Sequence, residues 1–157
     1  MMITGRLWKA GTWWLAESET ADVCTQGRSR KDAARMLADA FETLLDRPTC
    51  KVTVTDDGHA SGEVTIEASE PAALAAFVLQ RLRQHSGKSL SEVARSMGRA
   101  SKNAYARYEQ GRAVPTIEMF DHLLRAVSND TTLIIGSRRL GAKKAPPPAK
   151  RRKPRVA

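Results

Sequence analysis

The fold of the second half of this 157-residue chain is decided between Ser89 and Gly111, where the sequence reads SLSEVARSMGRASKNAYARYEQG. Ser89 and Glu92 have the capping-box spacing, in which a serine hydroxyl and a glutamate carboxylate bind backbone N–H groups at the start of a helix. Gly98 can take the positive φ of a tight turn, and a second helix is expected near 102–109, ending at Gly111. Two short helices joined by a glycine-containing turn predict a helix-turn-helix.

The residues on both sides of this stretch continue the helical pattern. Pro71 suits the first turn of a helix, because its missing N–H would have no helical partner there. Apolar residues follow along one side of that helix: Leu74, Phe77, Val78 and Leu82. Thr116 is expected to cap a later helix that turns four apolar residues inward: Ile117, Phe120, Leu123 and Leu124. We therefore predict an all-α domain over 70–136.

The first 69 residues read as strands around one helix. β-branched and aromatic residues predict three strands, over 3–8, 12–16 and 23–26. The first two strands are expected to form a hairpin with its turn at Lys9–Gly11.

A helix and a second hairpin complete this domain. Ser29 has the position of an N-cap, and Pro48 stops the helix that follows. Its apolar residues recur at helical spacing: Ala33, Met36, Leu37, Ala40, Phe41, Leu44 and Leu45. Alternating runs at 51–55 and 63–67 then predict a hairpin with four inward residues: Val52, Val54, Val64 and Ile66. The expected fold class is α+β, with an α+β domain over 1–69 ahead of the all-α domain.

Charge is distributed unevenly along the chain. Residues 1–69 hold 8 basic and 11 acidic residues, whereas 138–157 hold 9 basic residues and none that is acidic. A segment with few apolar groups and self-repelling charge cannot offset its ordering entropy by burial, so we expect a disordered tail over 137–157. Such a tail attracts polyanions by releasing counterions from phosphates, or it is a solubilising extension without a partner.

Composition and motifs exclude several classes of protein. No run approaches the ~20 consecutive apolar residues that cross a bilayer, and the first residues do not read as a signal peptide. Cys24 and Cys50 give neither a disulfide framework nor a zinc spacing. The sequence has no glycine-rich phosphate loop, and Asp56, Asp57 and Glu63 give no sign of converging on a metal. We therefore expect a soluble intracellular binding protein that is no enzyme and uses no cofactor.

The start of the second short helix carries side chains that suit DNA. Only residues near the N-terminus of such a helix reach base edges in the ~12 Å major groove. Here these residues are Ser101, Lys102, Asn103 and, one turn later, Arg107. Asparagine can bind adenine through two hydrogen bonds, whereas lysine and arginine bind guanine or phosphates. The alternative for Asn103 is a polar residue facing water, and the pattern favours double-stranded DNA as the partner.

Neighbouring residues are expected to support this surface. Tyr105 and Tyr108 flank Arg107, and tyrosines at this spacing more often pack against a core than stack on bases. The N–H groups at the helix starts near Ser89 and Ser101 are expected to add phosphate sites.

Two further features predict contacts with proteins. Trp13 and Trp14 are adjacent on a strand and must point to opposite faces, so we expect one to pack against the helix over 33–45. The other is expected to be exposed and able to anchor a partner. The run Thr132–Ile135 is β-prone and too short to be stable alone, and we expect it to pair with its copy in a twofold mate or to extend a sheet edge.

Both halves resemble one bacterial family. Residues 89–111 with Pro115 look like a Cro/C1-type (XRE) helix-turn-helix, and the motif NAYARYEQG within them recurs in HicB-type antitoxins. Residues 12–17 and 25–33 look like the HicB fold, a partial RNase H-like α+β unit. The resemblance covers roughly 1–136 in the family's order, and two concordant halves are more specific than either motif alone.

The resemblance implies a type II antitoxin that works in the bacterial cytoplasm, associated with the nucleoid when it is bound to DNA. Its HicB-like domain would mask a HicA-type mRNA interferase, and its helix-turn-helix would repress the shared operon. A homodimer or higher homo-oligomer is expected, because one helix-turn-helix reads few bases. The alternative is a stand-alone XRE-family transcription regulator whose N-terminal domain dimerises or senses a ligand.

The resemblance also assigns residues. In the matching frame the DNA-facing positions are Lys102, Asn103, Ala104 and Arg107. Arg112, just beyond the second short helix, would suit a phosphate. The family's usual DNA-facing glutamine at the start of the first short helix is replaced by Leu90, which cannot donate a hydrogen bond to a phosphate.

Overall fold

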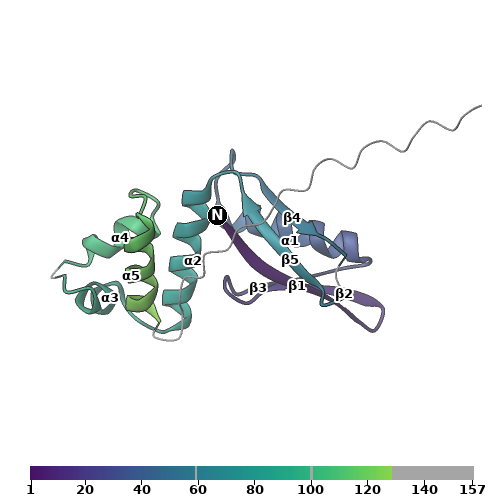
Figure 1. Ribbon diagram of the computed structural model, residues 1–157, viewed down its shortest axis with the longest axis horizontal. Coiled ribbons are helices and arrows are strands. Elements are labelled where there is room, and N and C mark those ends of the chain that lie inside the picture. Colours follow the sequence, from purple (N-terminus) through teal and green to yellow (C-terminus); the bar gives the residue numbers. More distant parts are fainter. Residues whose placement is uncertain (59, 100, 129–157) are drawn as a thin grey trace, which may run out of the picture.

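The computed structural model describes residues 1–58, 60–99 and 101–128 (Figure 1). The strands are β1 (Met2–Ala10), β2 (Trp13–Ser18), β3 (Val23–Gly27), β4 (Val52–Asp56) and β5 (Glu63–Ala68). The helices are α1 (Arg30–Leu45), α2 (Pro71–His85), α3 (Leu90–Ser96), α4 (Asn103–Glu109) and α5 (Ile117–Val127). Strands around one helix precede a run of helices, as the sequence predicts for the α+β class.

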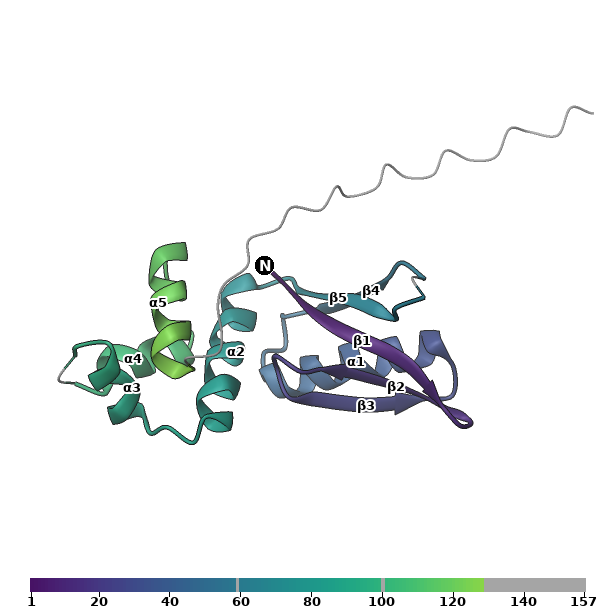
Figure 2. The same ribbon diagram turned by 60° about the horizontal axis from the view of Figure 1, so that its bottom comes forward.

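An antiparallel sheet of order β3-β2-β1-β5-β4 forms the first part of the molecule, and α1 lies against one of its faces (Figure 2). Side chains alternate between the faces, so Ile3 and Leu7 of β1 join the core beside α1. Thr4 and Arg6 point the other way and are exposed. Because β5 pairs with β1, β4 lies at an edge of the sheet.

The helix α1 begins where its cap was predicted. The Asp32 N–H donates to the Ser29 hydroxyl at 3.1 Å. Leu37 and Phe41 are fully buried, four residues apart on the stripe that faces the sheet. The expectation that Leu44 joins this stripe is wrong, since it is 41% exposed. An α-helix has about 3.6 residues per turn, so Leu44, three residues after Phe41, falls short of the buried stripe. Leu45, four residues after Phe41, packs against the core.

The first turn also differs from the expectation. It was predicted at Lys9–Gly11, but β1 continues through Ala10, which pairs with Trp13. The connection is therefore the two residues Gly11 and Thr12. Gly11 has φ of 61°, the left-handed conformation that such a short hairpin turn requires.

Two hydrophobic cores share α2. Residues of α2 that join the first core are Ala73, Leu74, Phe77 and Val78, and those that join the second are Ala75 and Leu79. Phe77 meets Phe41 of α1 edge to face, with ring centroids 5.8 Å apart. The prediction of one apolar side for this helix was therefore incomplete, because α2 is buried on two sides between the sheet and the remaining helices (Figure 1).

The second core is formed where α3, α4 and α5 pack with α2. Its other buried residues are Val93, Ala94, Tyr105, Phe120, Leu123, Leu124, Ala126 and Val127. Thr116 caps α5 as predicted, accepting from the Met119 N–H at 3.2 Å. The expectation that Ile117 points inward is wrong, since it is 67% exposed. It is the first residue of α5, and the stripe that reaches the core begins one turn later.

Some expectations fall beyond the described residues. The strand-like run at 132–135 and the tail over 137–157 lie outside them. The domain boundary between residues 69 and 70 stays a prediction. None of the helices within 1–58, 60–99 and 101–128 has the length and apolar character needed to span a bilayer.

Candidate nucleic-acid interface

The first short helix, α3, starts with the predicted capping box. The Glu92 N–H donates to the Ser89 hydroxyl at 3.2 Å, and the Ser89 N–H donates to the Glu92 carboxylate at 2.8 Å. This backbone donor holds the pKa of Glu92 below its ordinary value. Glu92 therefore occupies the Ser89 N–H, and the expected phosphate site at this helix start stays a prediction for the N–H groups that follow.

The C-terminal end of α3 is fixed by a Schellman motif. Gly98 has φ of 68°, as its position in the sequence predicts. Its N–H donates to the Arg95 carbonyl at 2.9 Å, and the Arg99 N–H donates to the Ala94 carbonyl at 2.8 Å. The chain thus leaves α3 in a defined direction toward α4.

The inner side of α4 is held against α2. Tyr105 is fully buried, and its hydroxyl donates to the Leu79 carbonyl at 3.3 Å. Burial raises the pKa of Tyr105, with a further contribution from the charge of Glu109. Tyr108 is half-buried against the same core. The prediction that both tyrosines pack inward is confirmed.

A shielded ion pair also joins α4 to α2. The Arg83 Nε donates to the Glu109 carboxylate at 2.6 Å, and the two side chains are only 17% and 7% exposed. This hydrogen bond raises the pKa of Arg83. A second nitrogen of Arg83 donates to the Lys88 carbonyl at 3.0 Å, so the pair also fixes the segment before α3. Lys88 in turn donates to the Ala126 carbonyl of α5 at 3.0 Å.

The outer side of α4 carries the residues predicted to contact DNA. Ser101, Lys102, Asn103, Arg107 and Arg112 are exposed, and Ala104 is half-buried. A surface depression brings four of the six together, lined by Asn103, Ala104, Ala106, Arg107, Gln110 and Arg112. Ser101 and Lys102, the two residues before Asn103 in the sequence, do not line this depression. The Ser101 hydroxyl accepts from the Asn103 N–H at 3.3 Å, so one donor expected for a phosphate near Ser101 is already bound.

The end of α4 positions Arg112 and reveals a residue that sequence reasoning missed. Gly111 has φ of 64°, and the Arg112 N–H donates to the Arg107 carbonyl at 2.9 Å, which forms a second Schellman motif. Gln110 lines the depression with Asn103 and Arg107. Its spacing of seven residues from Asn103 and three from Arg107 places all three on one side of α4, which is the signal that could have identified it.

This end of the molecule presents several cations to solvent. The exposed basic residues from α3 to the segment after α4 are Arg95, Arg99, Lys102, Arg107 and Arg112. The Arg107 guanidinium lies 5.3 Å from the centroid of the Tyr108 ring, which restricts its direction. Leu90 is half-buried against the second core, so its apolar side chain contributes to packing. It has no hydrogen-bond donor to offer a phosphate.

The carboxylates considered for catalysis do not converge. Asp56 accepts two hydrogen bonds from Arg30, at 2.6 and 2.7 Å. It is paired across the strands with Val64, so Glu63 points to the opposite face of the sheet. In the part of the chain that the structure describes, no three His, Cys, Asp or Glu residues gather in a way that could hold a metal ion.

The two tryptophans divide between the faces of the sheet as predicted. Trp14 packs against the first core, with the Arg30 guanidinium 5.7 Å from the centroid of its ring. Trp13 is 42% exposed. The exposed tryptophan is therefore Trp13.

Residues 74–132 match a protein family described as a helix-turn-helix domain. The matched segment begins within α2 and includes α3, α4 and α5, so it covers the surface described above. No match was found among curated proteins. The match supports an XRE-type helix-turn-helix and DNA binding by the second half of the chain.

Proposed function

We propose that this protein is a sequence-specific DNA-binding transcription regulator that reads the major groove with α4. The observation that carries the proposal is the division of α4 into two sides. Tyr105 and Glu109 hold one side against α2, and the other presents Asn103 and Arg107 to solvent. The family match over 74–132 supports the same function.

The chemistry of the exposed side fits an edge-on approach to base pairs. A helix fits the ~12 Å major groove, and its first turn comes closest to the base edges. Asn103 can accept from adenine N6 and donate to N7, while Arg107 and Lys102 can reach guanine or phosphates. Arg112, placed beside the end of α4, suits a phosphate of the same duplex.

The experiment is a selection of duplexes from a random DNA library with the full chain, followed by binding measurements on the selected sequence. Asn103→Ala is expected to cost ~1–3 kcal/mol at one base position and to relax the preference there. Gln80→Ala, an exposed residue of α2, is the matched control and should change nothing. An equal loss on all sequences would assign Asn103 to backbone contact and not to base reading.

The basic residues within 137–157 are expected to add binding energy that does not depend on the DNA sequence. Removing residues 137–157 takes away nine basic residues and should weaken binding and flatten its salt dependence. The preference for the selected duplex should remain. If the preference disappears with these residues, the reading of bases by α4 is contradicted.

A finer hypothesis is an antitoxin that masks an mRNA interferase and represses its own operon, and the exposed Trp13 favours it. An exposed tryptophan provides a large apolar anchor for a protein partner. The test is calorimetry with the product of a small reading frame adjacent to this gene, using Trp13→Ser as the variant. Absence of binding would leave a stand-alone regulator whose first domain dimerises or senses a ligand.

We further infer a homodimer or higher homo-oligomer, since a single helix-turn-helix reads few bases and two copies can hold two half-sites about one helical turn apart. The proposed contact is the run at 132–135. Sedimentation of Ile134→Asp should show a monomer, and a variant that stays dimeric would contradict this contact. We also propose that the protein is not an enzyme, because Asp56 and Glu63 point to opposite faces of the sheet.

A further inference from the structure

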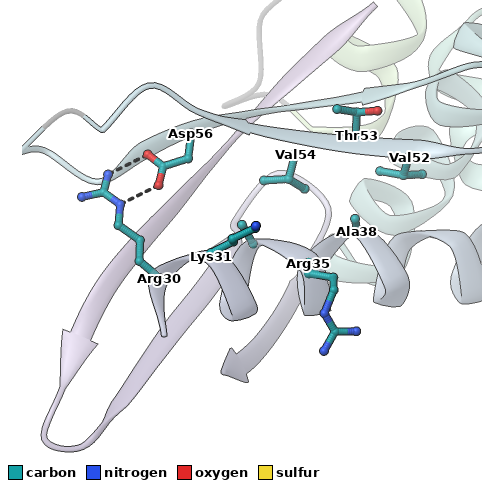
Figure 3. A pocket seen from close by; sticks show the side chains of 9 residues that line it. Arg30, Lys31, Arg35, Ala38, Val52, Thr53, Val54 and Asp56 are labelled. Atoms are coloured by element: carbon teal, nitrogen blue, oxygen red, sulfur yellow. Dashed lines mark hydrogen bonds and ion pairs between the residues drawn. The ribbon is translucent and has the colours of Figure 1, made fainter. Parts of the chain in front are cut away.

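A groove lies between the edge strand β4 and the helix α1, far from the surface of α4 in the sequence. It is lined by Arg30, Lys31, Ala34, Arg35, Ala38, Val52, Thr53, Val54 and Asp56 (Figure 3). Figure 3 shows Arg30 reaching from α1 to Asp56 at one end of β4, with Val54 facing α1. The groove therefore has an apolar middle and a charged end.

The outer edge of β4 exposes main-chain groups. The Ser69 N–H donates to the Lys51 carbonyl at 2.8 Å, which makes these residues a hydrogen-bonded pair of the antiparallel ladder. Hydrogen-bonded and non-hydrogen-bonded pairs alternate along an antiparallel ladder. The next residue, Val52, and then Val54 therefore belong to non-hydrogen-bonded pairs, and their N–H and C=O groups point away from β5. The Val52 N–H donates to the Glu42 carboxylate at 3.0 Å, whereas Val54 has no main-chain partner among the described residues.

The charges along the groove favour one kind of ligand. Arg35 bonds to Asp32 and Asp39 and points away from β4, so its charge is largely satisfied on α1 (Figure 3). Lys31 is exposed and forms no ion pair within the described residues, although it lines the groove. A carboxylate on a ligand in the groove could form a charge-assisted hydrogen bond with the Lys31 ammonium.

We propose that this groove binds an extended segment of a partner protein, which adds to β4 as a further strand and places a carboxylate beside Lys31. Main-chain hydrogen bonds to Val54 would supply affinity, as in other cases of strand addition to a sheet edge. Alternate side chains of the segment would enter the groove, because their spacing follows the pleat of the strand. One of them would be apolar and pack over Ala34 and Ala38, and the next on that side would be acidic.

This site goes beyond the proposed regulation of transcription and does not depend on DNA binding. A basic segment such as 138–157 would not pair with Lys31, so the proposal takes an acidic segment of another protein as the ligand. A partner with an acidic extended segment is the occupant that the edge and the charge together favour.

The test is a random heptapeptide library displayed on phage and selected on the immobilised full chain. The counter-selection uses Val54→Pro, which removes the outward N–H and leaves the ladder with β5 intact, since proline is tolerated on an edge strand. Both proteins carry the same basic residues at 137–157, so peptides that bind those residues are discarded. Enrichment of peptides that alternate apolar and acidic residues is the expected result.

The synthetic consensus peptide is then titrated against point variants. Lys31→Glu should weaken binding about tenfold, and the exposed Lys9→Glu is the matched control that should leave it unchanged. If Val54→Pro does not fold, the second variant is Ala38→Glu. Its carboxylate would occupy the groove and repel the acidic side chain of the peptide. Far-UV circular dichroism and thermal melting establish the fold of each variant.

Three outcomes overturn the proposal. The first is the absence of enrichment over the counter-selection. The second is a consensus peptide whose affinity is the same for Lys31→Glu and Lys9→Glu. The third is a concentration-dependent dimer that Val54→Pro abolishes without any enriched peptide, which would assign this edge to a second copy of the chain. Each result is read without DNA, so a failure here is distinguishable from a failure of the proposed regulator.

Discussion

The two hydrophobic cores that share α2 are built from elements of very different length. The first rests on a five-stranded sheet and the 16-residue α1, whereas the second gathers α3 and α4, of seven residues each, with the 11-residue α5. Helices of seven residues are not stable alone in water. Contacts with α2, more than intrinsic helix stability, therefore set the geometry of the candidate DNA-binding surface on α4.

Removing the aromatic ring that holds α4 against α2 is expected to have the largest effect on stability. Tyr105→Ala empties a fully buried site and should lower the free energy of unfolding by about 3–5 kcal/mol. Hydrogen exchange should show that α3, α4 and α5 lose protection while β1 to β5 retain theirs. The loss should be local because Tyr105 contributes to the second core alone.

Phe41→Ala is the matched variant in the first core, where the ring is also fully buried. Phe41 contacts Phe77, and α2 in turn supports α4. We therefore expect this variant to reduce protection in both parts of the molecule. If Tyr105→Ala lowers the protection of the sheet as strongly as Phe41→Ala does, the two cores form one cooperative unit.

The ion pairs of the two regions should differ in their effect on stability. Glu109→Ala leaves the shielded Arg83 without its carboxylate and should lower the free energy of unfolding by about 1–3 kcal/mol. Asp39→Ala breaks an exposed pair with Arg35 on α1 and should lower the free energy of unfolding far less. Urea denaturation measures both. Similar losses of unfolding free energy would indicate that burial does not set how much each ion pair contributes to stability.

A pair of glycines tests the contact between the two regions. Gly98→Ala and Gly111→Ala each place alanine at positive φ, at a cost of about 1 kcal/mol. A Cβ at Gly98 meets open space, whereas one at Gly111 would overlap a guanidinium nitrogen of Arg47 from the first region. Arg47 must then move from Glu70, its partner at 3.3 Å. Gly111→Ala should therefore have the lower melting temperature, and equal melting temperatures would exclude a stabilising role for Arg47 here.

The sequence predicted the elements that local signals mark. Both serine caps, the turn glycine at position 98 and the end of α4 at Gly111 were placed correctly, because capping and positive φ depend on a few adjacent residues. The exposed Asn103 and Arg107 beside a buried Tyr105 also follow from helical spacing. These residues are the part of the candidate site that could be predicted.

Features that depend on the order of elements in space could not be predicted in this way. The second buried side of α2 consists partly of alanines, and small residues do not reveal which of two cores they meet. The groove beside Val54 exists because β5 lies between β1 and β4 and leaves β4 at an edge. The exposure of Ile117 follows from where α5 starts to contact its neighbours. None of these facts is contained in a local pattern.

The smallest expected effect is the response of the two helix caps to acid. Hydrogen bonds from the Ser89 N–H to Glu92, and from the Arg28 N–H to Asp32, hold the pKa of each carboxylate below its ordinary value. A lowered acid pKa stabilises the fold above the unfolded value, about 4.3 for glutamate and 3.9 for aspartate. That stabilisation is lost as the pH falls through the folded value.

The two helices should respond differently, because the seven-residue α3 depends on its cap more than the 16-residue α1 does. Between pH 5 and about pH 3, amide exchange in the first turn of α3 should rise more than in the first turn of α1. Glu92→Gln retains an acceptor for the Ser89 N–H without a titrating proton, so it should remove most of this pH dependence in α3. Equal responses of the two helices would show that element length does not set the sensitivity of a cap to acid.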